Sequence, residues 1–350
     1  MEKDHVNEPN TKPPRLPTEF AMQWFGSMAH PQMQEIADLA DGYIRWIAKE
    51  TDWDLIALDG LTFTDNYAGA LASIDRGKPG MRAPQPTTTE YGSGSAMTVG
   101  VMRGDQLRFR VVVHVSDLLF LLEENGASIR KGLYTLAHEL AHVELSASFY
   151  RSFPGAFGEP PRCGKRFPPL FLTAFRAWNE YAASRYSANY RPEQVKDYEQ
   201  VLRSSIIHCS KRVNEAFVTF DKERKHLIAL HEVHSACEAV VVAGSYLMGH
   251  LAGDGFNSAS INEHIQSLTD DEVWLSLLDE VRGCLERLWA QLEWESEEVF
   301  TALAEVVRKT IALHGVAVGW RENGIQSAPV RSPLLALRLN LELDQLSQSS

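Results

Sequence analysis

The chain has 350 residues, 44% of them hydrophobic, and its 34 basic and 46 acidic residues give a formal net charge of −12. A chain of this length can form two or more domains with packed cores, and its negative charge argues against nucleic acid or anionic membranes as partners. The sequence opens with acidic and proline residues instead of a secretory signal, and no apolar run approaches the ~18 residues of a membrane span, so we expect a cytoplasmic protein.

The first part of the chain predicts a mixture of helix and strand. After a flexible tail over residues 1–18, apolar residues at helical spacing predict a helix over residues 31–49. Short apolar runs bounded by turn residues predict strands at 54–64 and 69–75. Residues 96–116 predict two strands joined across the sequence RGDQ, where a Gly-Asp pair is ordinary turn chemistry, so we expect a β-hairpin there.

The rest of the chain predicts helices. Helical spacing continues through residues 117–124, 128–150 and 170–190, and from Pro192 to Gly315 the sequence predicts long helices with a bundle-type core. Two helix starts are predicted by capping-box pairs, which are Ser260 with Glu263 and Thr269 with Glu272. We expect an α+β domain over residues 19–190 and an all-helical domain over residues 191–345.

The sequence TLAHELAHVEL at residues 135–145 contains two histidines four positions apart. On a helix, His142 lies about 40° around the axis from His138, and Glu139 lies about 60° beyond His142, so all three project from one side. Two imidazoles at this spacing can bind one metal ion, and the glutamate can accept a proton from a water molecule beside it. The alternative is that these residues are polar groups on an ordinary amphipathic helix, but the flanking apolar residues would make unpartnered burial costly.

The motif His138-Glu139-x-x-His142, on a helix that follows a β-hairpin, resembles the active-site helix of the zincin metallopeptidases. The metzincin branch is excluded, because it requires glycine where this chain has Leu145 and histidine or aspartate where it has Ser148. The resemblance implies an α+β fold with a small mixed or antiparallel sheet and one catalytic Zn²⁺. It also implies hydrolysis of peptide bonds with Glu139 as the general base.

A catalytic zinc ion usually has three protein ligands, so a third must come from elsewhere in the chain. Gluzincin-type enzymes use a glutamate on the next helix, and Glu180 in AWNEYAASRYSA is the corresponding candidate. On a helix, the small residues Ala183, Ser184 and Ser187 share its side and would let that helix come close to the motif helix. The spacing Glu180, Ala183, Tyr186 also resembles the E-x-x-A-x-x-[FY] pattern of ImmA/IrrE-type proteins. The alternative is that Glu180 is a solvated carboxylate on a helix surface. Glu144 is excluded because it projects to the opposite side from His138.

A group that stabilises a developing oxyanion would complete such a site. His231 and His234 share one helical side, and His250 and Tyr181 are further candidates among which the sequence does not choose. The alternative for the two histidines is a hydrogen-bonded polar patch on a bundle helix.

The four cysteines are widely separated and show no C-x-x-C spacing, which predicts reduced thiols rather than disulfides or a cysteine-based zinc site. Cys163 lies among basic residues, which lower the pKa of a thiol. Its P-R-C-G context resembles the cysteine switch of matrix metallopeptidases, although it follows the motif helix instead of preceding it. A regulatory thiol and an ordinary loop cysteine are the two interpretations.

These features predict a zinc metallopeptidase acting on a protein or peptide substrate, which would bind along a strand of the 95–115 hairpin by adding to the sheet edge. Two other functions remain. One is a non-catalytic protein with a structural zinc ion that binds a partner through its long helices. The other is a metal-free helical interaction module.

Overall fold

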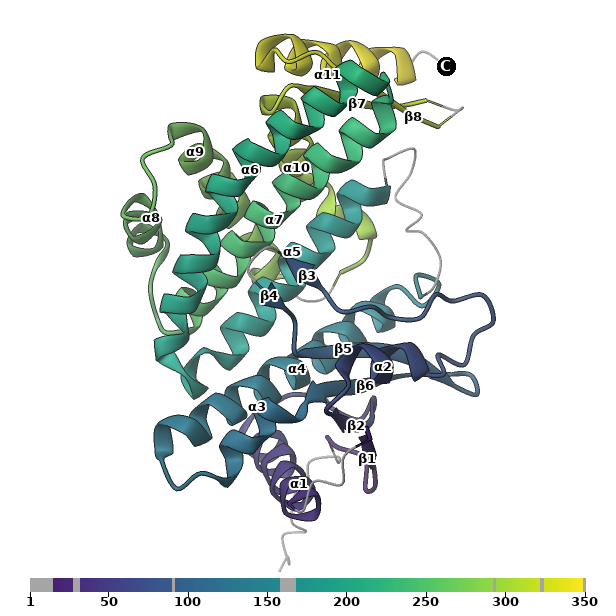
Figure 1. The fold of residues 1–350 in the computed structure, drawn as a ribbon, viewed down its shortest axis with the longest axis vertical. Coiled ribbons are helices and arrows are strands. Elements are labelled where there is room, and N and C mark those ends of the chain that lie inside the picture. Colours follow the sequence, from purple (N-terminus) through teal and green to yellow (C-terminus); the bar gives the residue numbers. More distant parts are fainter. Residues whose placement is uncertain are drawn as a thin grey trace, which may run out of the picture.

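The computed structural model describes residues 15–27, 32–89, 92–157, 168–291, 294–321 and 324–348. The fold is mixed α+β and 66% helical, with a small sheet in the first half and a helical region in the second, as predicted (Figure 1). The first 14 residues of the predicted tail lie outside the described residues. Arg15 is held against the domain, because its carbonyl oxygen accepts the Leu55 N–H at 2.7 Å.

The main sheet has four strands in the order β1-β2-β6-β5. Strand β1 is parallel to β2, β2 is parallel to β6, and β5 pairs antiparallel with β6. The predicted hairpin is confirmed, with a turn at Gly104, and it makes β5 an edge strand of the sheet. The bounds are β1 Ala21–Phe25, β2 Leu58–Thr64, β5 Ala96–Arg103 and β6 Gln106–His114.

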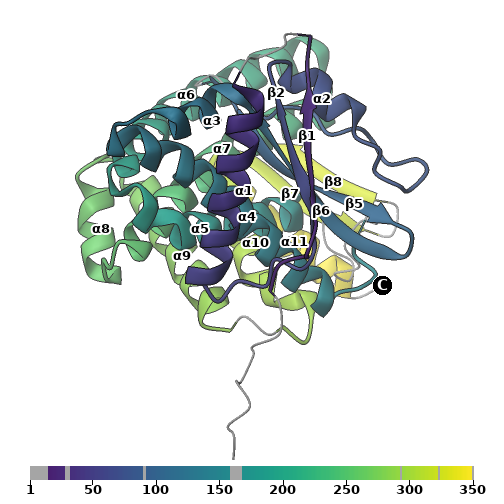
Figure 2. The same ribbon diagram turned by 90° about the horizontal axis from the view of Figure 1, so that it is seen from below.

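Helices cover both faces of this sheet (Figure 2). Helices α1 (Met33–Glu50) and α4 (Gly126–Ser152) share the larger core with one face, and α2 (Tyr67–Ser73) packs on the other. The strand predicted at 69–75 is therefore wrong. Asn66 caps a helix there by accepting the Gly69 N–H, and Tyr67, Ala70 and Leu71 are buried at helical spacing against the sheet.

The remaining elements lie mostly in the second half. They are β3 Thr88–Thr89, β4 Gly92–Ser93, α3 Val115–Leu119, η1 Phe120–Leu122, α5 Pro168–Ser187, η2 Ala188–Tyr190, η3 Pro192–Gln194, α6 Val195–Glu223, α7 His226–Gly253, α8 Ser258–Gln266, α9 Glu272–Ala290, η4 Glu297–Phe300, α10 Thr301–Leu313, β7 Val316–Arg321, β8 Gly324–Pro329 and α11 Pro333–Gln348.

The second half differs from the prediction in two respects. It is not entirely helical, because Gly315, at φ 85°, turns the chain after α10 into the antiparallel hairpin β7–β8. The two predicted capping boxes are also wrong. Asn257 caps α8 and Asp271 caps α9, because their short side-chain oxygens reach the free N–H groups of the first turn.

Helix α7 is the one described helix that is long and apolar enough to cross a membrane, and 50% of its most apolar stretch is buried inside the fold. A core helix of a soluble protein has the same properties, and α7 packs along both α5 and α6 (Figure 1). One hydrophobic core runs from α1 through α4 and α5 to α7 and α10. Helix α5 therefore packs against both the sheet-bearing half, through α4, and the helical half, through α7.

Helices α5 and α7 approach each other closely at a glycine. A Cβ atom added at Gly249 would lie 2.0 Å from the carbonyl oxygen of Tyr181. We therefore expect Gly249→Ala to lower the free energy of unfolding by about 1–3 kcal/mol, because the helices must move apart. Denaturant unfolding measures this change.

Gly42→Ala on the exposed side of α1 is the matched control, since a Cβ atom there meets nothing within 4 Å. It should stabilise the chain by up to about 1 kcal/mol through helix propensity. Equal stability of the Gly249→Ala variant and the native protein would contradict the close contact between α5 and α7.

Candidate metal centre

Helix α4 carries the histidine motif between the sheet and α5. It begins at Gly126, where the Asn125 side chain accepts the Ala127 N–H at 3.0 Å, and it continues through apolar residues that are buried on several sides. Glu180 projects from α5, whose neighbouring positions Ala183, Ser184 and Ser187 are fully buried. These small side chains let α5 approach the motif helix, as the sequence predicts.

The structure brings His138, His142 and Glu180 together. The two Nε2 atoms lie 3.2 Å apart, and Glu180 Oε2 lies 3.4 Å from His138 Nε2 and 3.2 Å from His142 Nε2. The three side chains are 11–17% exposed. The three atoms thus form a nearly equilateral triangle that is largely shielded from solvent.

The other ring nitrogens of the histidines are already occupied. His142 Nδ1 lies 3.0 Å from Asn179 Oδ1, which can only accept, so this nitrogen carries the ring proton. His138 Nδ1 lies 3.4 Å from Ser187 Oγ, and that hydroxyl donates to the Ala183 carbonyl at 2.8 Å. With Nδ1 engaged in this way, each ring directs its Nε2 atom toward the triangle, where a metal ion would take the place of a proton.

The triangle fits a metal ion. A tetrahedral zinc ion with bonds of ~2.0–2.1 Å holds its ligand atoms about 3.3–3.4 Å apart, close to the three observed separations. Glu180 Oε2 is buried and receives no hydrogen bond from the described residues. Three lone pairs that converge in a buried place repel one another unless a cation or a proton lies between them.

The charges at the site lead to the same conclusion. Burial acts to lower the pKa of His142, but the Glu180 carboxylate outweighs it and raises this pKa to about 9. Burial likewise acts to raise the pKa of Glu180, yet the two histidines hold it well below its usual range. The carboxylate therefore stays ionised and attracts positive charge to the centre of the triangle.

Glu139 lies beside the triangle and is held from the sheet. Its carboxylate is 6% exposed, and Thr98 Oγ1 on edge strand β5 lies 2.8 Å from Glu139 Oε2. The ligand atoms of His138, Glu139 and His142 lie within 4.8 Å of one another. Thr98 was not predicted, because its contact with Glu139 depends on how the hairpin packs against α4.

Tyr246 on α7 lies on the opposite side of the site from the sheet. Its ring stacks 5.9 Å from the His138 ring. Burial raises the pKa of Tyr246, and the adjacent Glu180 carboxylate, to which its hydroxyl donates, raises it further. The hydroxyl is therefore a neutral hydrogen-bond donor next to the candidate metal ligands. The sequence alone does not indicate a role for Tyr246, although this residue lies on the same predicted helix as His231 and His234.

Three predicted oxyanion donors lie elsewhere. The Tyr181 hydroxyl accepts from Arg185 at 2.8 Å and its ring faces Trp289. His234 bonds Thr173 Oγ1 at 3.0 Å, and His231 is a 76% exposed side chain beside Glu232. Both histidines are 12 or more residues before Tyr246 on α7, which corresponds to about 18 Å or more along the helix axis.

His250 lies near the site without facing it. It is buried, its Nε2 donates to the Pro192 carbonyl at 3.1 Å, and its ring lies 6.1 Å from the Tyr134 ring. Burial lowers the pKa of His250, so the ring stays neutral. Glu144 lies on the other side of α4, as predicted, and accepts the Asp54 N–H at 2.6 Å. Cys163 lies outside the described residues.

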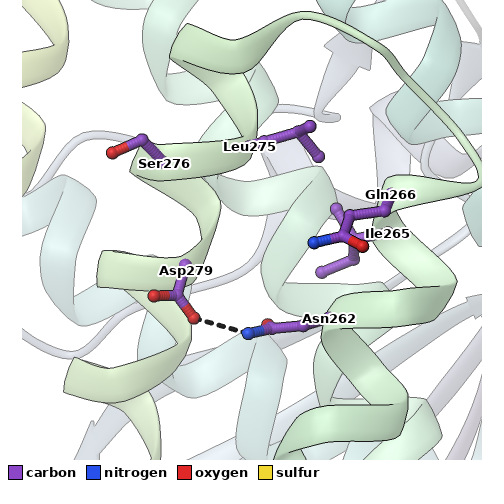
Figure 3. Close-up of a pocket in the computed structure, with 6 residues that line it drawn as sticks. All are labelled: Asn262, Ile265, Gln266, Leu275, Ser276 and Asp279. Atoms are coloured by element: carbon purple, nitrogen blue, oxygen red, sulfur yellow. Dashed lines mark hydrogen bonds between the residues drawn. The ribbon is translucent and has the colours of Figure 1, made fainter.

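A separate pocket lies between α8 and α9 (Figure 3). Asp279 and Asn262 are hydrogen-bonded across it at 2.7 Å. Its lining contains no histidine or cysteine and one carboxylate, so it offers no catalytic or metal-binding group comparable to the triangle. The residues that line it are Asn262, Ile265, Gln266, Leu275, Ser276 and Asp279.

Comparison of the chain with protein-family models, with curated proteins and with solved structures found no match. Interpretation of the site therefore depends on its own geometry.

Asn179 is the residue that orients His142. We expect Asn179→Ala to weaken zinc binding by about 10–100-fold, because the ring loses the acceptor that fixes its tautomer. Asn179→Asp, which keeps an acceptor, should bind zinc at least as tightly as the native protein. Competition with a chromophoric chelator measures both affinities.

Asn189→Ala is the matched control, because Asn189 is exposed on η2 a few residues beyond α5. It should leave zinc affinity unchanged. An Asn179→Ala protein that binds zinc as tightly as this control would show that the bond between Asn179 and His142 does not orient a metal ligand.

Proposed function

We propose that this protein is a zinc-dependent hydrolase of peptide bonds, with His138, His142 and Glu180 as the zinc ligands. The observation that carries the proposal is the triangle of three acceptor atoms 3.2–3.4 Å apart, with a second carboxylate, that of Glu139, beside it. Three protein ligands leave one coordination position for water or substrate, which is typical of catalytic rather than structural zinc.

The bound ion would act as a Lewis acid and lower the pKa of a water molecule to near 7. Glu139 would accept the proton of the attacking water and then deliver it to the nitrogen of the leaving amine. The hydrogen bond from Thr98 holds the Glu139 carboxylate in one orientation. A base that is already oriented loses less conformational entropy on reaching the transition state, which lowers the reaction barrier.

A peptide substrate would bind along β5. In the antiparallel ladder between β5 and β6, Val99 pairs with Arg110 and Val101 with Arg108. Because hydrogen-bonded and non-hydrogen-bonded pairs alternate along such a ladder, the backbone N–H and C=O groups of the even-numbered residues of β5 point away from β6. Arg76 covers this outer edge at Gly100 and Met102. The edge at Thr98 lies next to Glu139, so an added strand would pass the general base.

Tyr246 would stabilise the oxyanion that forms on the substrate carbonyl. It approaches the ligands from α7, and burial keeps its hydroxyl protonated and able to donate. The tetrahedral intermediate gains negative charge on oxygen, and a fixed donor at that position stabilises the transition state more than the substrate. This role replaces those predicted for Tyr181, His231, His234 and His250.

Two other functions make different predictions about the metal. A structural zinc ion would need a fourth protein ligand, whereas Glu139, the nearest candidate, is hydrogen-bonded to Thr98. A metal-free interaction module would contain no zinc. Metal analysis of protein purified without an affinity tag tests the metal-free module, because a zinc content far below one per chain that does not rise on adding zinc excludes the enzyme. An exchangeable water molecule on the bound ion would distinguish the enzyme from a protein with a structural zinc ion.

We expect Glu139→Gln to keep its zinc and to lose at least about 100-fold in kcat, because the amide cannot accept a proton. His138→Ala should lose both the zinc ion of the triangle and activity. The test compares the peptides that the native protein and Glu139→Gln each produce from a cell extract. Cleavages made only by the native protein identify the substrate, and their rates measure the loss of activity.

Glu144→Gln is the matched control on the same helix, since its amide oxygen can still accept the Asp54 N–H. It should retain both zinc and activity. Full activity of Glu139→Gln on a defined substrate would assign the general base to another residue.

For Tyr246→Phe we expect a kcat about 10–1,000-fold lower with little change in KM, because the lost donor acts on the oxyanion and not on the bound peptide. The zinc ion of the triangle should remain bound. Steady-state kinetics on a substrate identified above measures the change. An unchanged kcat, or a rise in KM alone, would show that Tyr246 does not stabilise the transition state.

A further inference from the structure

A second group of metal-binding side chains lies in the helical half. Cys209 on α6, Cys237 on α7 and His314, directly after α10, have their ligand atoms within 4.8 Å of one another. Both cysteines are buried, at 1% and 0% exposure, and both are free thiols. The wide spacing of the cysteines in the sequence hides this group, because α6 and α7 bring them together only when they pack side by side (Figure 1).

The histidine is oriented like a metal ligand. His314 Nδ1 bonds the Thr310 carbonyl at 2.8 Å, so it carries the ring proton and Nε2 is left as the nitrogen available to the sulfur atoms. The Trp274 ring packs 5.0 Å from the imidazole and restricts its rotation. Two donors from α6 and α7 and one from the residue that follows α10 therefore meet in one buried place.

We propose that Cys209, Cys237 and His314 form a second metal site, which binds Zn²⁺. Thiolate and imidazole ligands together select zinc over harder cations such as Mg²⁺ or Ca²⁺. Two thiolates and a neutral imidazole also cancel the charge of a divalent ion. A neutral complex is the form that a buried site can hold at low cost.

The electrostatic environment favours a thiolate at Cys209. Hydrogen bonds from Cys237 and His314 lower the pKa of Cys209 to about 6, although burial acts to raise it. Burial raises the pKa of Cys237, and so does its neighbour Cys209. The guanidinium of Arg212 attracts negative charge to both.

The spacing suits such a complex. Zinc–sulfur bonds of ~2.3 Å in a tetrahedral site place two sulfurs about 3.8 Å apart, so the donors need to move by no more than roughly 1 Å. Cys237 precedes Tyr246 by nine residues on α7, about 13.5 Å along the axis, so this site is separate from the histidine triangle. A metal ion here would join α6 and α7 to the start of β7 through the sequence His314-Gly315-Val316.

Cobalt(II) distinguishes the two sites, because only a site with thiolates gives a thiolate-to-cobalt charge-transfer band in the near ultraviolet. We expect the full-length protein, reduced with a phosphine, to bind two cobalt ions per chain and to show this band. Cys209→Ser should lose the band and one ion, whereas His138→Ala should lose the other ion and keep the band. Cys163→Ser should keep both.

Cys284→Ser is the matched control, since Cys284 is buried on α9 and contacts Arg287 instead of the cluster. It should keep the band and both ions. Absence of the band from the native protein, or its survival in Cys209→Ser, overturns the proposed second site. Neither outcome affects the histidine triangle, whose ion is counted separately with His138→Ala.

A second measurement does not depend on the folding of a cysteine variant. X-ray absorption by zinc-loaded His138→Ala reports the ligands of the remaining ion. Two sulfur neighbours at ~2.3 Å are expected. A shell that contains only nitrogen and oxygen overturns the proposal. Circular dichroism verifies that His138→Ala remains folded.

Discussion

The arrangement of the site depends on three lone pairs, two from imidazoles and one from a carboxylate, that are brought together in a place largely closed to water. Such an arrangement is unfavourable by itself, and only positive charge at its centre offsets the repulsion. The arrangement nevertheless persists in the fold, because the supporting contacts hold the three groups in position. Asn179 and Ser187 orient the rings, and small buried residues on α5 let the carboxylate come close.

Helix α5 links the two halves of the molecule and thereby assembles the site. It packs against α4 on one side and against α7 on the other, where Gly249 permits backbone contact with Tyr181. The sheet-bearing half supplies Glu139 and its partner Thr98, and the helical half supplies Tyr246. A proton acceptor and a hydrogen-bond donor thus come to the proposed ligands from different halves of the molecule, and these are the two groups that the proposed hydrolysis uses.

The sequence predicted those parts of the site and fold that depend on local spacing. Helical periodicity placed His138, Glu139 and His142 on one side, and the turn chemistry near Gly104 predicted the hairpin. The prediction of Glu180 rested on a resemblance and on the small residues around it, and the structure places its carboxylate within 3.4 Å of both rings. Thr98 and Tyr246 could not be predicted, because their positions depend on packing between elements far apart in the sequence. Short-range competition explains other errors, since Asn66 starts a helix where apolar residues suggested a strand.

The cluster of Cys209, Cys237 and His314 could not be predicted from the sequence for the same reason. Rules for cysteine spacing recognise sites built within one or two adjacent turns, whereas Cys209 on α6, Cys237 on α7 and His314, directly after α10, meet only after these helices pack. Helix α7 carries both Cys237 and Tyr246. An ion bound to the cysteines would fix α7 against α6 and α10, and it would therefore restrict the movement of Tyr246 relative to α5. Through α7, a metal ion at the cysteines would therefore affect both the rigidity of the helical half and the position of the proposed oxyanion donor.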